Sequence, residues 1–419
     1  MTREISADAF RPSDHVRPGD LVAWGQACAE PATLTEALVA ERHAIGGRFT
    51  AFVGIGFADT LRPEHTDIID VRSYCATGTN RHLAAVGVLD ILPSHYSAMS
   101  RQLGATVDVL LLQLAPTGDA GRFSFGLACD YLHPAIARAR TVIAEVNDDL
   151  PATRSDWTIG ADDIDIVVRT SRPPVFAPET PPGPLDPAIA ANVADLIPDG
   201  ATLQVGLGGM PAAVVDALSG HRNLGIHSGL LNPSLVRLMT AGAVTNIHKG
   251  RADGAEGASV AGLIAGGADT FQACHGNPAI KLAPTSYTHS QRVLGRLHRF
   301  TAINSAIEVD LTGQINAEVA GGRYVGAVGG ATDFLRGAAA SDGGLPIIAL
   351  PSSVETRDGR RISRIVPRLS GPTSIGRADA GVIVTEYGAA DLRGMTDAQR
   401  RRALIAIAHP DLRETLDRS

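Results

Sequence analysis

The fold of this 419-residue chain is decided by the stretch Leu203-Gln204-Val205-Gly206-Leu207-Gly208-Gly209-Met210-Pro211. Its apolar start belongs to a predicted strand over 201–205, and its end leads into a predicted helix over 212–218. Glycines let a backbone approach a ligand closely, and a helix N-terminus offers N–H groups to an anion or oxyanion. The same pattern also fits a tight turn that only packs. It matches neither the Gly-Lys-Ser/Thr phosphate loop nor the glycine spacing of the dinucleotide fingerprint.

Similar units occur on both sides of this stretch. Strands that alternate with helices are typical of mostly parallel sheets covered by helices. We therefore predict an α/β fold made of two tandem open α/β domains with mostly parallel sheets. The further predicted strands are 107–112, 141–146, 164–168, 224–227, 302–304, 346–350 and 381–385, and the further predicted helices are 187–197 and 397–409.

A proline-rich segment divides these elements into two groups. Six prolines fall within 172–184, and proline continues neither a helix nor a central strand. We place the domain boundary there, which gives an N-terminal domain at 1–178 and a C-terminal domain at 184–419. The C-terminal domain carries the glycine loop.

Composition and charge narrow the class of protein. Of the residues, 44% are apolar and 19% are charged, as in ordinary globular chains. The net charge is −7 and no basic run reaches five residues, which argues against nucleic acid or a membrane surface as a partner. No stretch approaches the roughly 18 uninterrupted apolar residues of a membrane span.

The cysteines indicate the compartment. They are too few for a disulfide framework, and their wide spacing does not fit structural zinc. We expect buried, reduced thiols, no metal site and a cytoplasmic location. The four are Cys28, Cys75, Cys129 and Cys274.

Three further features of the sequence fit a catalytic or ligand-binding role. His227-Ser228 ends a predicted strand, where open α/β sheets bind ligands, although a histidine there also fits a structural role. Glu308 and Asp310 share one face of a β pattern, a position where carboxylates are usually solvated. A second glycine cluster spans 326–334. No Gly-x-Ser-x-Gly elbow with a strand before it and a helix after it supports a serine hydrolase.

Taken together and in order, these stretches resemble the acetyl-CoA hydrolase/transferase group of the family I CoA-transferases. That group includes 4-hydroxybutyrate and succinyl-CoA:acetate CoA-transferases. The N-terminal half matches more loosely, through 107–109, 121–124 and 144–147. In the C-terminal half the matching stretches are Leu203-Gln204-Val205-Gly206-Leu207-Gly208, Leu224-Gly225-Ile226-His227-Ser228, 302–310, Val328-Gly329-Gly330, Asp333-Phe334, 363–367, Val384-Thr385-Glu386-Tyr387-Gly388 and 407–410.

The resemblance implies two similar domains with the active site between them. It implies acyl-CoA and a small carboxylic acid as reactants, no permanently bound cofactor, and a homodimer or larger homo-oligomer. In such enzymes a glutamate attacks the thioester, and CoA thiolate opens the resulting anhydride to a glutamyl-CoA thioester. The residues that match the loop over this intermediate are Gly206, Leu207 and Gly208, with Gly209 beside them, and those that match CoA-contacting positions are Asn304, Gly326, Gly329 and Gly330.

The chain departs from the family's pattern at its centre. The nucleophilic glutamate of the family directly follows the His-Ser pair, and here that position is Gly229. Glycine has no side chain, so it is neither nucleophile nor base. Pro233-Ser234 stands where the family usually has Asp-Gly, and Ala331 where it commonly has glutamine.

Three hypotheses follow. The first is an enzyme that transfers CoA directly in a ternary complex, or hydrolyses the thioester, with Glu308 and then His227 as acid/base candidates. The second is a standard transferase whose nucleophile comes from elsewhere, such as Glu318 or Glu386; restoring that geometry by chance is difficult. The third is a CoA or acyl-CoA binding protein without turnover, since a fold survives the loss of catalysis.

Overall fold

The computed structural model describes residues 2–249, 257–356 and 358–419. It confirms the predicted α/β fold with mostly parallel sheets. The chain forms two compact units, and neither is contiguous in sequence. Unit 1 comprises the described residues of Met1–Pro178, Leu231–Pro233 and Val260–Thr288, and unit 2 those of Glu179–Leu230, Ser234–Ser259 and His289–Ser419. The single domain boundary between 178 and 184 stays a prediction.

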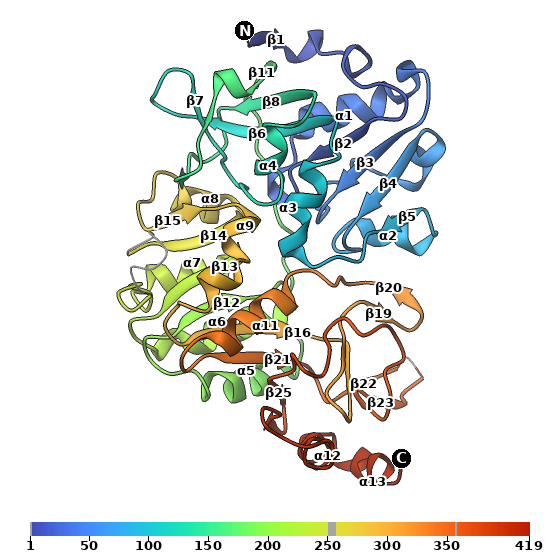
Figure 1. The fold of residues 1–419 in the computed structure, drawn as a ribbon, viewed down its shortest axis with the longest axis vertical. Coiled ribbons are helices and arrows are strands. Elements are labelled where there is room, and N and C mark those ends of the chain that lie inside the picture. The colour runs from blue at the N-terminus through green and yellow to red at the C-terminus, as the bar shows by residue number, and fades with distance from the viewer. Residues whose placement is uncertain (1, 250–256, 357) are drawn as a thin grey trace. The chain divides into compact units, whose positions relative to one another are not determined.

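Unit 1 is built on a sheet whose main strands are all parallel. Their order is β1-β11-β8-β6-β2-β3-β4-β5 (Figure 1), and β7 and β10 pair antiparallel beside β6. Nearly all of β6 is buried, as expected of a parallel strand covered on both faces. The strands are β1 (Arg3–Ser6), β2 (Leu21–Trp24), β3 (Phe49–Val53), β4 (Ile69–Ser73), β5 (Leu89–Ile91), β6 (Val109–Pro116), β7 (Arg122–Ser124), β8 (Thr141–Asn147), β9 (Arg154–Ser155), β10 (Ile159–Gly160), β11 (Ile166–Thr170), β14 (Ser259–Ile264) and β15 (Ile280–Leu282).

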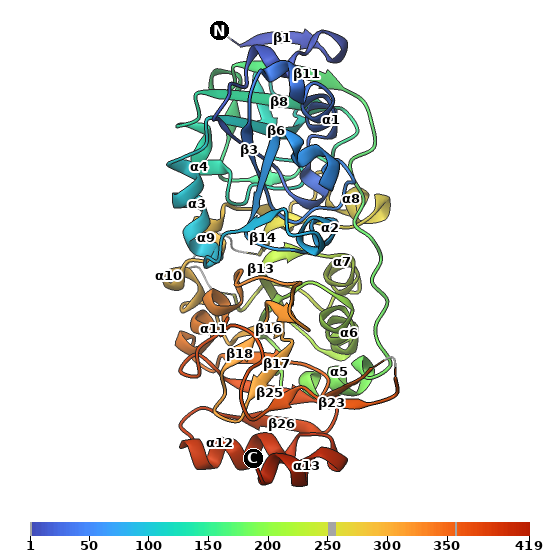
Figure 2. The same cartoon turned by 90° about the vertical axis from the view of Figure 1, so that its right-hand side faces the viewer.

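Helices cover both faces of the unit 1 sheet. Figure 2 shows α1 and α2 on one side of it and α3 and α4 on the other. Buried apolar side chains such as Trp24, Phe49 and Leu111 form the core beneath them. The helices are α1 (Ala32–Ala40), α2 (Asn80–Ala85), α3 (Tyr96–Gly104), α4 (His133–Ile136), α8 (Ala268–Cys274) and α9 (Thr285–Thr288).

Unit 2 contains a second, largely parallel set of strands. Their order is β26-β25-β21-β16-β12-β13, and only β26 is antiparallel to its neighbour. The shorter strands form small sheets of their own. The strands are β12 (Thr202–Val205), β13 (Gly225–Leu231), β16 (Phe300–Ser305), β17 (Glu308–Asp310), β18 (Ile315–Asn316), β19 (Val319–Ala320), β20 (Arg323–Tyr324), β21 (Leu345–Ala349), β22 (Ser353–Glu355), β23 (Arg361–Ser363), β24 (Ile365–Val366), β25 (Val382–Thr385) and β26 (Gly388–Asp391).

Helices also flank the unit 2 strands. In Figure 2, α5, α6 and α7 lie on one side of β13 and β16, and α10 and α11 lie on the other. Phe300, Phe334 and Ile348 belong to the buried core of this unit. The helices are α5 (Asp186–Ala194), α6 (Gly209–Ala217), α7 (Pro233–Thr240), α10 (Gln291–Leu294), α11 (Ala331–Ala340), α12 (Asp397–Ala406) and α13 (Pro410–Asp417).

The predicted elements differ from the observed ones mainly at their ends. Helix α6 begins at Gly209 rather than at 212, because Gly208 is its N-cap. Strand β13 runs past the predicted 224–227 to Leu231, so Gly229 lies inside a strand. The predicted helix 397–409 is two helices, because His409 caps the second one and accepts a hydrogen bond from the Asp411 N–H.

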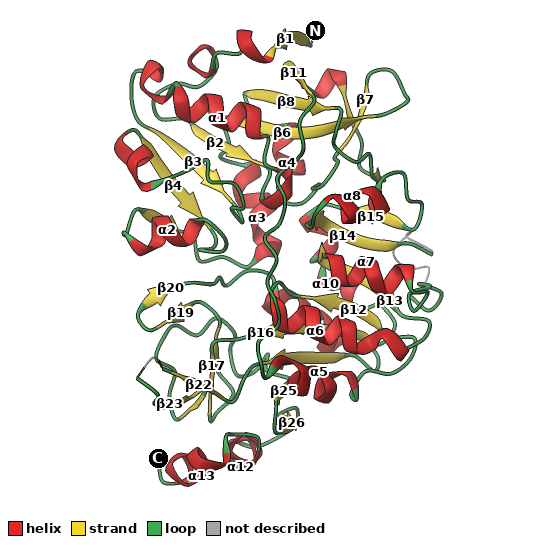
Figure 3. Cartoon of the chain, turned by 180° about the vertical axis from the view of Figure 1, so that it is seen from behind, coloured by secondary structure: helices red, strands yellow, loops and turns green. Residues whose placement is uncertain are grey.

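Two further observations concern the whole described chain. Residues 171–185 form neither helix nor strand, and Figure 3 shows this proline-rich segment as an extended loop. Among the described residues, no helix is both long and apolar enough to cross a bilayer.

Candidate active site

The candidate site lies in unit 2, at the carboxyl edge of three neighbouring strands. Strand β12 pairs in parallel with β13 on one side and β16 on the other, so the three strands end at the same edge. Open α/β sheets bind ligands at such edges. The backbone continues this pairing into the glycine loop, because Gly206 N–H donates to the Ile303 carbonyl at 2.9 Å.

The loop between β12 and α6 depends on glycine for two different reasons. Gly208 has φ +112° and ψ 176°, a conformation that is essentially restricted to glycine. A Cβ on Gly209 would lie 2.7 Å from the Pro181 carbonyl oxygen, so this glycine is required for close packing. Leu207, which precedes these two glycines, is 39% exposed. The loop therefore presents its backbone and one apolar side chain at the sheet edge.

Asn304 lies beside this loop but is held by a neighbouring side chain. Its Nδ2 donates to Gln204 Oε1 at 2.9 Å, and Gln204 Nε2 donates to Asn304 Oδ1 at 3.3 Å. Both side chains are buried. A Cβ on Gly206 would lie 3.6 Å from Asn304 Oδ1, so the structure brings the predicted loop and the predicted Asn304 together.

His227 and Gly229 occupy one side of β13, because residues two apart in a strand face the same way. His227 is fully buried, and its ring meets Phe300 edge-on, with 6.4 Å between the ring centroids. Gly229 is only partly buried. The nearest neighbours of a Cβ built on Gly229 are His289 Cε1 at 3.3 Å and Nε2 at 3.5 Å, and Phe334 Cε2 at 3.5 Å.

His289 is a site residue that the sequence did not indicate. It lies between α9 and α10 in no recognisable motif, and only the fold brings it to Gly229. Its ring centroid lies 4.2 Å from that of Phe334. Burial, with a smaller contribution from His227, lowers the pKa of His289 to about 3. The imidazole is therefore neutral at physiological pH.

In the second glycine cluster, some glycines allow close packing and others lie at the candidate site. A Cβ on Gly326 would come within 2.0 Å of the Ala317 carbonyl oxygen, so Gly326 allows close contact between two chain segments. Gly329 has φ +56°, the left-handed region. Gly330, the N-cap of α11, lies against His289.

Glu308, predicted as an acid/base residue, is buried and engaged at both carboxylate oxygens. Oε1 accepts hydrogen bonds from Ser370 N–H at 2.6 Å, Gly371 N–H at 3.2 Å and Asn316 Nδ2 at 3.0 Å, and Oε2 accepts from Ser370 Oγ at 3.0 Å. The neighbouring Asp310 is also buried, which differs from the solvated carboxylate expected there. Such a set of donors fixes a carboxylate in place.

The two other glutamates that were considered as nucleophiles are likewise hydrogen-bonded. Glu318 accepts from Ser374 Oγ at 2.7 Å and from Tyr324 Oη at 3.0 Å. Glu386 accepts from the N–H and Oγ of Ser352, at 2.9 and 2.7 Å. Each carboxylate thus binds a segment of its own unit.

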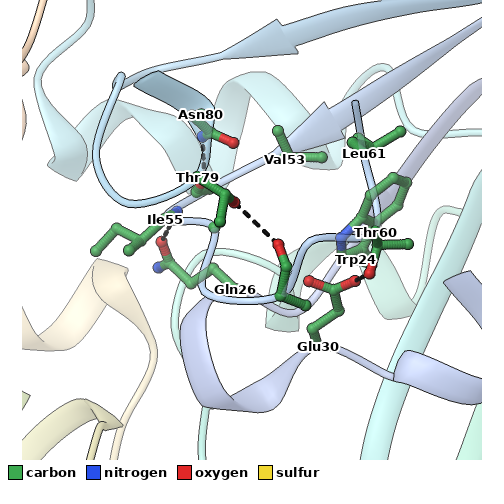
Figure 4. Close-up of a pocket in the computed structure, with 12 residues that line it drawn as sticks. Trp24, Gln26, Glu30, Val53, Ile55, Thr60, Leu61, Thr79 and Asn80 are labelled. Atoms are coloured by element: carbon green, nitrogen blue, oxygen red, sulfur yellow. Dashed lines mark hydrogen bonds between the residues drawn. The ribbon is translucent and has the colours of Figure 1, made fainter. Parts of the chain in front are cut away.

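Unit 1 contains a pocket of about 290 Å³, including its open mouth, which is lined by both apolar and polar residues. Figure 4 shows Trp24, Glu30 and Thr60 in its wall. Glu30 Oε1 accepts hydrogen bonds from Thr60 Oγ1 at 2.6 Å and from Thr35 Oγ1 at 2.8 Å. Burial raises the pKa of Glu30, which favours its protonated form.

Gln26, which lines this pocket, also belongs to a buried polar cluster. Its Nε2 donates to Asp130 Oδ2 at 2.8 Å, and its Oε1 accepts from Tyr74 Oη at 2.8 Å. The rings of Tyr74, Tyr96 and Tyr131 pack against one another. Burial raises the pKa of Asp130 to about 6.

Comparison of this chain with known proteins identifies its family. The model of the acetyl-CoA hydrolase/transferase N-terminal domain matches residues 8–177, and that of the C-terminal domain matches residues 266–419. The chain is 34% identical to the 4-hydroxybutyrate coenzyme A transferase of Clostridium kluyveri over 405 residues, which cover 94% of this chain and 92% of that protein.

A second relative and a solved structure agree with this assignment. The butyryl-CoA:acetate CoA-transferase of Anaerostipes caccae is 32% identical and covers 96% of this chain, with 92% of its own length matched. The crystal structure of RipA from Yersinia pestis matches with a TM-score of 0.91 and 31% identity, covering 99% of this chain and 96% of that one. The chain therefore belongs to the acetyl-CoA hydrolase/transferase family, an enzyme family of CoA-transferases and acetyl-CoA hydrolases.

Proposed function

We propose that this protein cleaves or transfers the thioester of a short-chain acyl-CoA, with water or a small carboxylic acid as acceptor, and does so without a glutamyl-CoA intermediate. Membership of the family supports the reaction class, and the relatives are named for butyryl-CoA, acetate and 4-hydroxybutyrate as reactants. The proposed absence of a glutamyl-CoA intermediate rests on one observation. Residue 229, at the sheet edge, is a glycine whose Cβ position faces a neutral imidazole and a phenyl ring.

The remaining carboxylates support the same proposal. Glu308, Glu318 and Glu386 are each held by hydrogen bonds from other segments of unit 2, which argues against any of them as a mobile nucleophile. A covalent glutamyl intermediate requires a carboxylate within reach of the thioester carbon. Without one, the acceptor itself attacks. We assign Glu308 a positioning role for the segment at Ser370, and His227 a place in the wall of the site.

The glycine loop supplies the electrostatic part of the proposed reaction. As water or a carboxylate adds to the thioester carbon, the carbonyl oxygen gains negative charge, and fixed backbone N–H groups stabilise that charge. Collapse of the adduct expels CoA thiolate. Water then yields the free acid and CoA, whereas a carboxylate yields a mixed anhydride that the thiolate reopens as the new acyl-CoA.

A single assay tests the proposal. The purified protein is incubated with acetyl-CoA or butyryl-CoA, with and without acetate, while free thiol and newly formed thioester are followed. Free thiol without added acid indicates hydrolysis, and an acid-dependent new thioester indicates transfer. If neither forms while calorimetry detects CoA binding, the protein is a binding protein and the proposed turnover is wrong.

A further inference from the structure

The pocket of unit 1 contains three polar side-chain atoms that the rest of the described chain leaves without a hydrogen-bond partner. They are Trp24 Nε1, Glu30 Oε2 and Asn80 Oδ1, all from side chains in the pocket wall. Glu30 and Asn80 bind their partners through their other polar atoms, Oε1 and Nδ2. The described atoms that are both unpartnered and sealed from solvent, such as Tyr131 Oη, do not include these three. The pocket therefore leaves all three open to a ligand.

The size of the pocket limits what it can hold. Figure 4 shows Asn80 across the pocket from Trp24 and Glu30, and Val53 and Leu61 add apolar surface to the wall. The enclosed part has room for about one or two water-sized groups, and the rest of its volume is the open mouth. The three polar side chains are 3–5% exposed, so packing fixes them. A ligand therefore inserts a small polar head and leaves its remainder at the mouth.

The charges around the pocket favour an uncharged head. Among the described residues that line it there is no lysine, arginine or histidine, so an anion would meet no positive charge. Burial raises the pKa of Glu30, and Glu36 and Glu145 raise it further, whereas its two threonine partners oppose the shift. The nearby cation Arg172 is paired with Glu36 at 2.9 Å. In the favoured protonated form Glu30 offers an O–H donor, as Trp24 offers an N–H, and two donors do not suit a cation.

We propose that this pocket is a binding site for the planar, uncharged head of a short primary amide, or for the equivalent head of an undissociated short carboxylic acid. The carbonyl oxygen of the ligand accepts hydrogen bonds from Trp24 Nε1–H and Glu30 Oε2–H. The amide N–H, or the acid O–H, donates to Asn80 Oδ1. No bond is formed or broken, and the inference does not depend on the proposed function.

Trp24 gives this site a direct signal, because the chain has one other tryptophan, Trp157. The protein is labelled with 15N at tryptophan, and Trp157→Phe identifies which indole N–H resonance belongs to Trp24. Propanamide, added to tens of millimolar at pH 7.5, is expected to shift the Trp24 resonance in a saturable way. The resonance of Trp157, which packs against Tyr287 at 5.1 Å between ring centroids, is expected to stay unchanged.

Propanoate distinguishes the two sources of such a head. At pH 7.5 it is a carboxylate and is expected to leave the Trp24 resonance unchanged. At pH 5 part of it is undissociated, and a shift of the Trp24 resonance is expected there. A shift with propanamide but none with propanoate at pH 5 assigns the site to amides.

Substitutions of Glu30 test its role as an uncharged donor. Glu30→Gln keeps an acceptor for the threonine hydroxyls and replaces the O–H by an N–H, so propanamide is expected to bind within about threefold of its affinity for the unsubstituted protein. Glu30→Met fills the space without a donor and is expected to weaken binding about tenfold. Glu4→Gln, at an exposed glutamate of β1 outside the pocket, is the control and is expected to change nothing.

Three results would overturn the proposal. The Trp24 resonance could stay fixed with propanamide, in which case the pocket holds only water. Propanoate at pH 7.5 could shift it as strongly as propanamide, which would make the pocket an anion site. Glu30→Gln could lose as much affinity as Glu30→Met, which would make Glu30 a charged partner. Should Glu30→Met not fold, Trp24→Phe, which keeps a ring but no N–H, is expected to weaken propanamide about tenfold in calorimetry, and unchanged affinity refutes the site.

Discussion

Replacing Gly208 by alanine is expected to disrupt the loop that opens α6, whereas the same change at Gly206 is expected to be tolerated. At Gly208, φ +112° and ψ 176° place the backbone in a region that costs other residues about 1–3 kcal/mol. Space is not the reason, because a Cβ there would meet only Pro211 Cδ, at 3.9 Å. At Gly206, φ is not positive, and a Cβ would make ordinary contacts at 3.6 Å with Asn304 Oδ1 and the Ile303 carbonyl.

Comparing Gly208→Ala with Gly206→Ala is informative because the effect of each substitution on the unfolded chain cancels. Each glycine-to-alanine change reduces the entropy of the unfolded chain by a similar amount, worth about 0.4–1 kcal/mol. The difference in free energy of unfolding between the two variants therefore reports the backbone strain at Gly208, and we expect about 1–3 kcal/mol in urea denaturation. CoA affinity and thiol release are expected to fall in Gly208→Ala alone. Equal stability and equal activity of the two variants would refute the structural reasoning.

Two further substitutions test buried carboxylates. Asp130 has a pKa of about 6 in the folded protein, against an ordinary value of 3.8. Its contribution to the free energy of unfolding is therefore fully present below about pH 4 and falls by about 3 kcal/mol as the pH rises through 6. The stability of Asp130→Asn relative to the unsubstituted protein should rise by that amount from pH 4 to 7, and a constant difference would contradict this. Glu308→Gln should lower the free energy of unfolding by about 1–3 kcal/mol through weaker hydrogen bonds from Ser370, Gly371 and Asn316. Its folded fraction should keep its turnover; a large loss of kcat at unchanged stability would instead make Glu308 catalytic.

The sequence is sufficient to predict the strand–loop–helix unit around Gly206, because strand periodicity, glycine and helix start coincide within ten residues. Asn304 was named only through the family resemblance, and it is the parallel pairing of β12 with β16 in the structure that brings it beside the loop. The end of β13 was less predictable. Glycine at 229 suggests a turn, and only pairing within the sheet extends the strand to Leu231.

His289 and the hydrogen bonds of Glu308 were outside the reach of sequence reasoning. His289 meets Gly229 and Gly330 through contacts between segments 40 to 60 residues apart, which leave no local pattern. Glu308 and Asp310 alternate with apolar residues as solvated strand residues do. Their burial depends on donors supplied by distant or irregular segments, such as the backbone of Ser370 and Gly371.

The central claim is that thioester chemistry here proceeds without a covalent glutamyl-CoA species, and intact-protein mass spectrometry during turnover measures this directly. The protein is mixed with acetyl-CoA, quenched within the first turnovers, and divided into samples with and without hydroxylamine or borohydride. The account predicts the unmodified mass in every sample while free thiol or exchanged acyl-CoA accumulates. A CoA-sized mass increase that hydroxylamine removes, located on any glutamate of the chain, would contradict it.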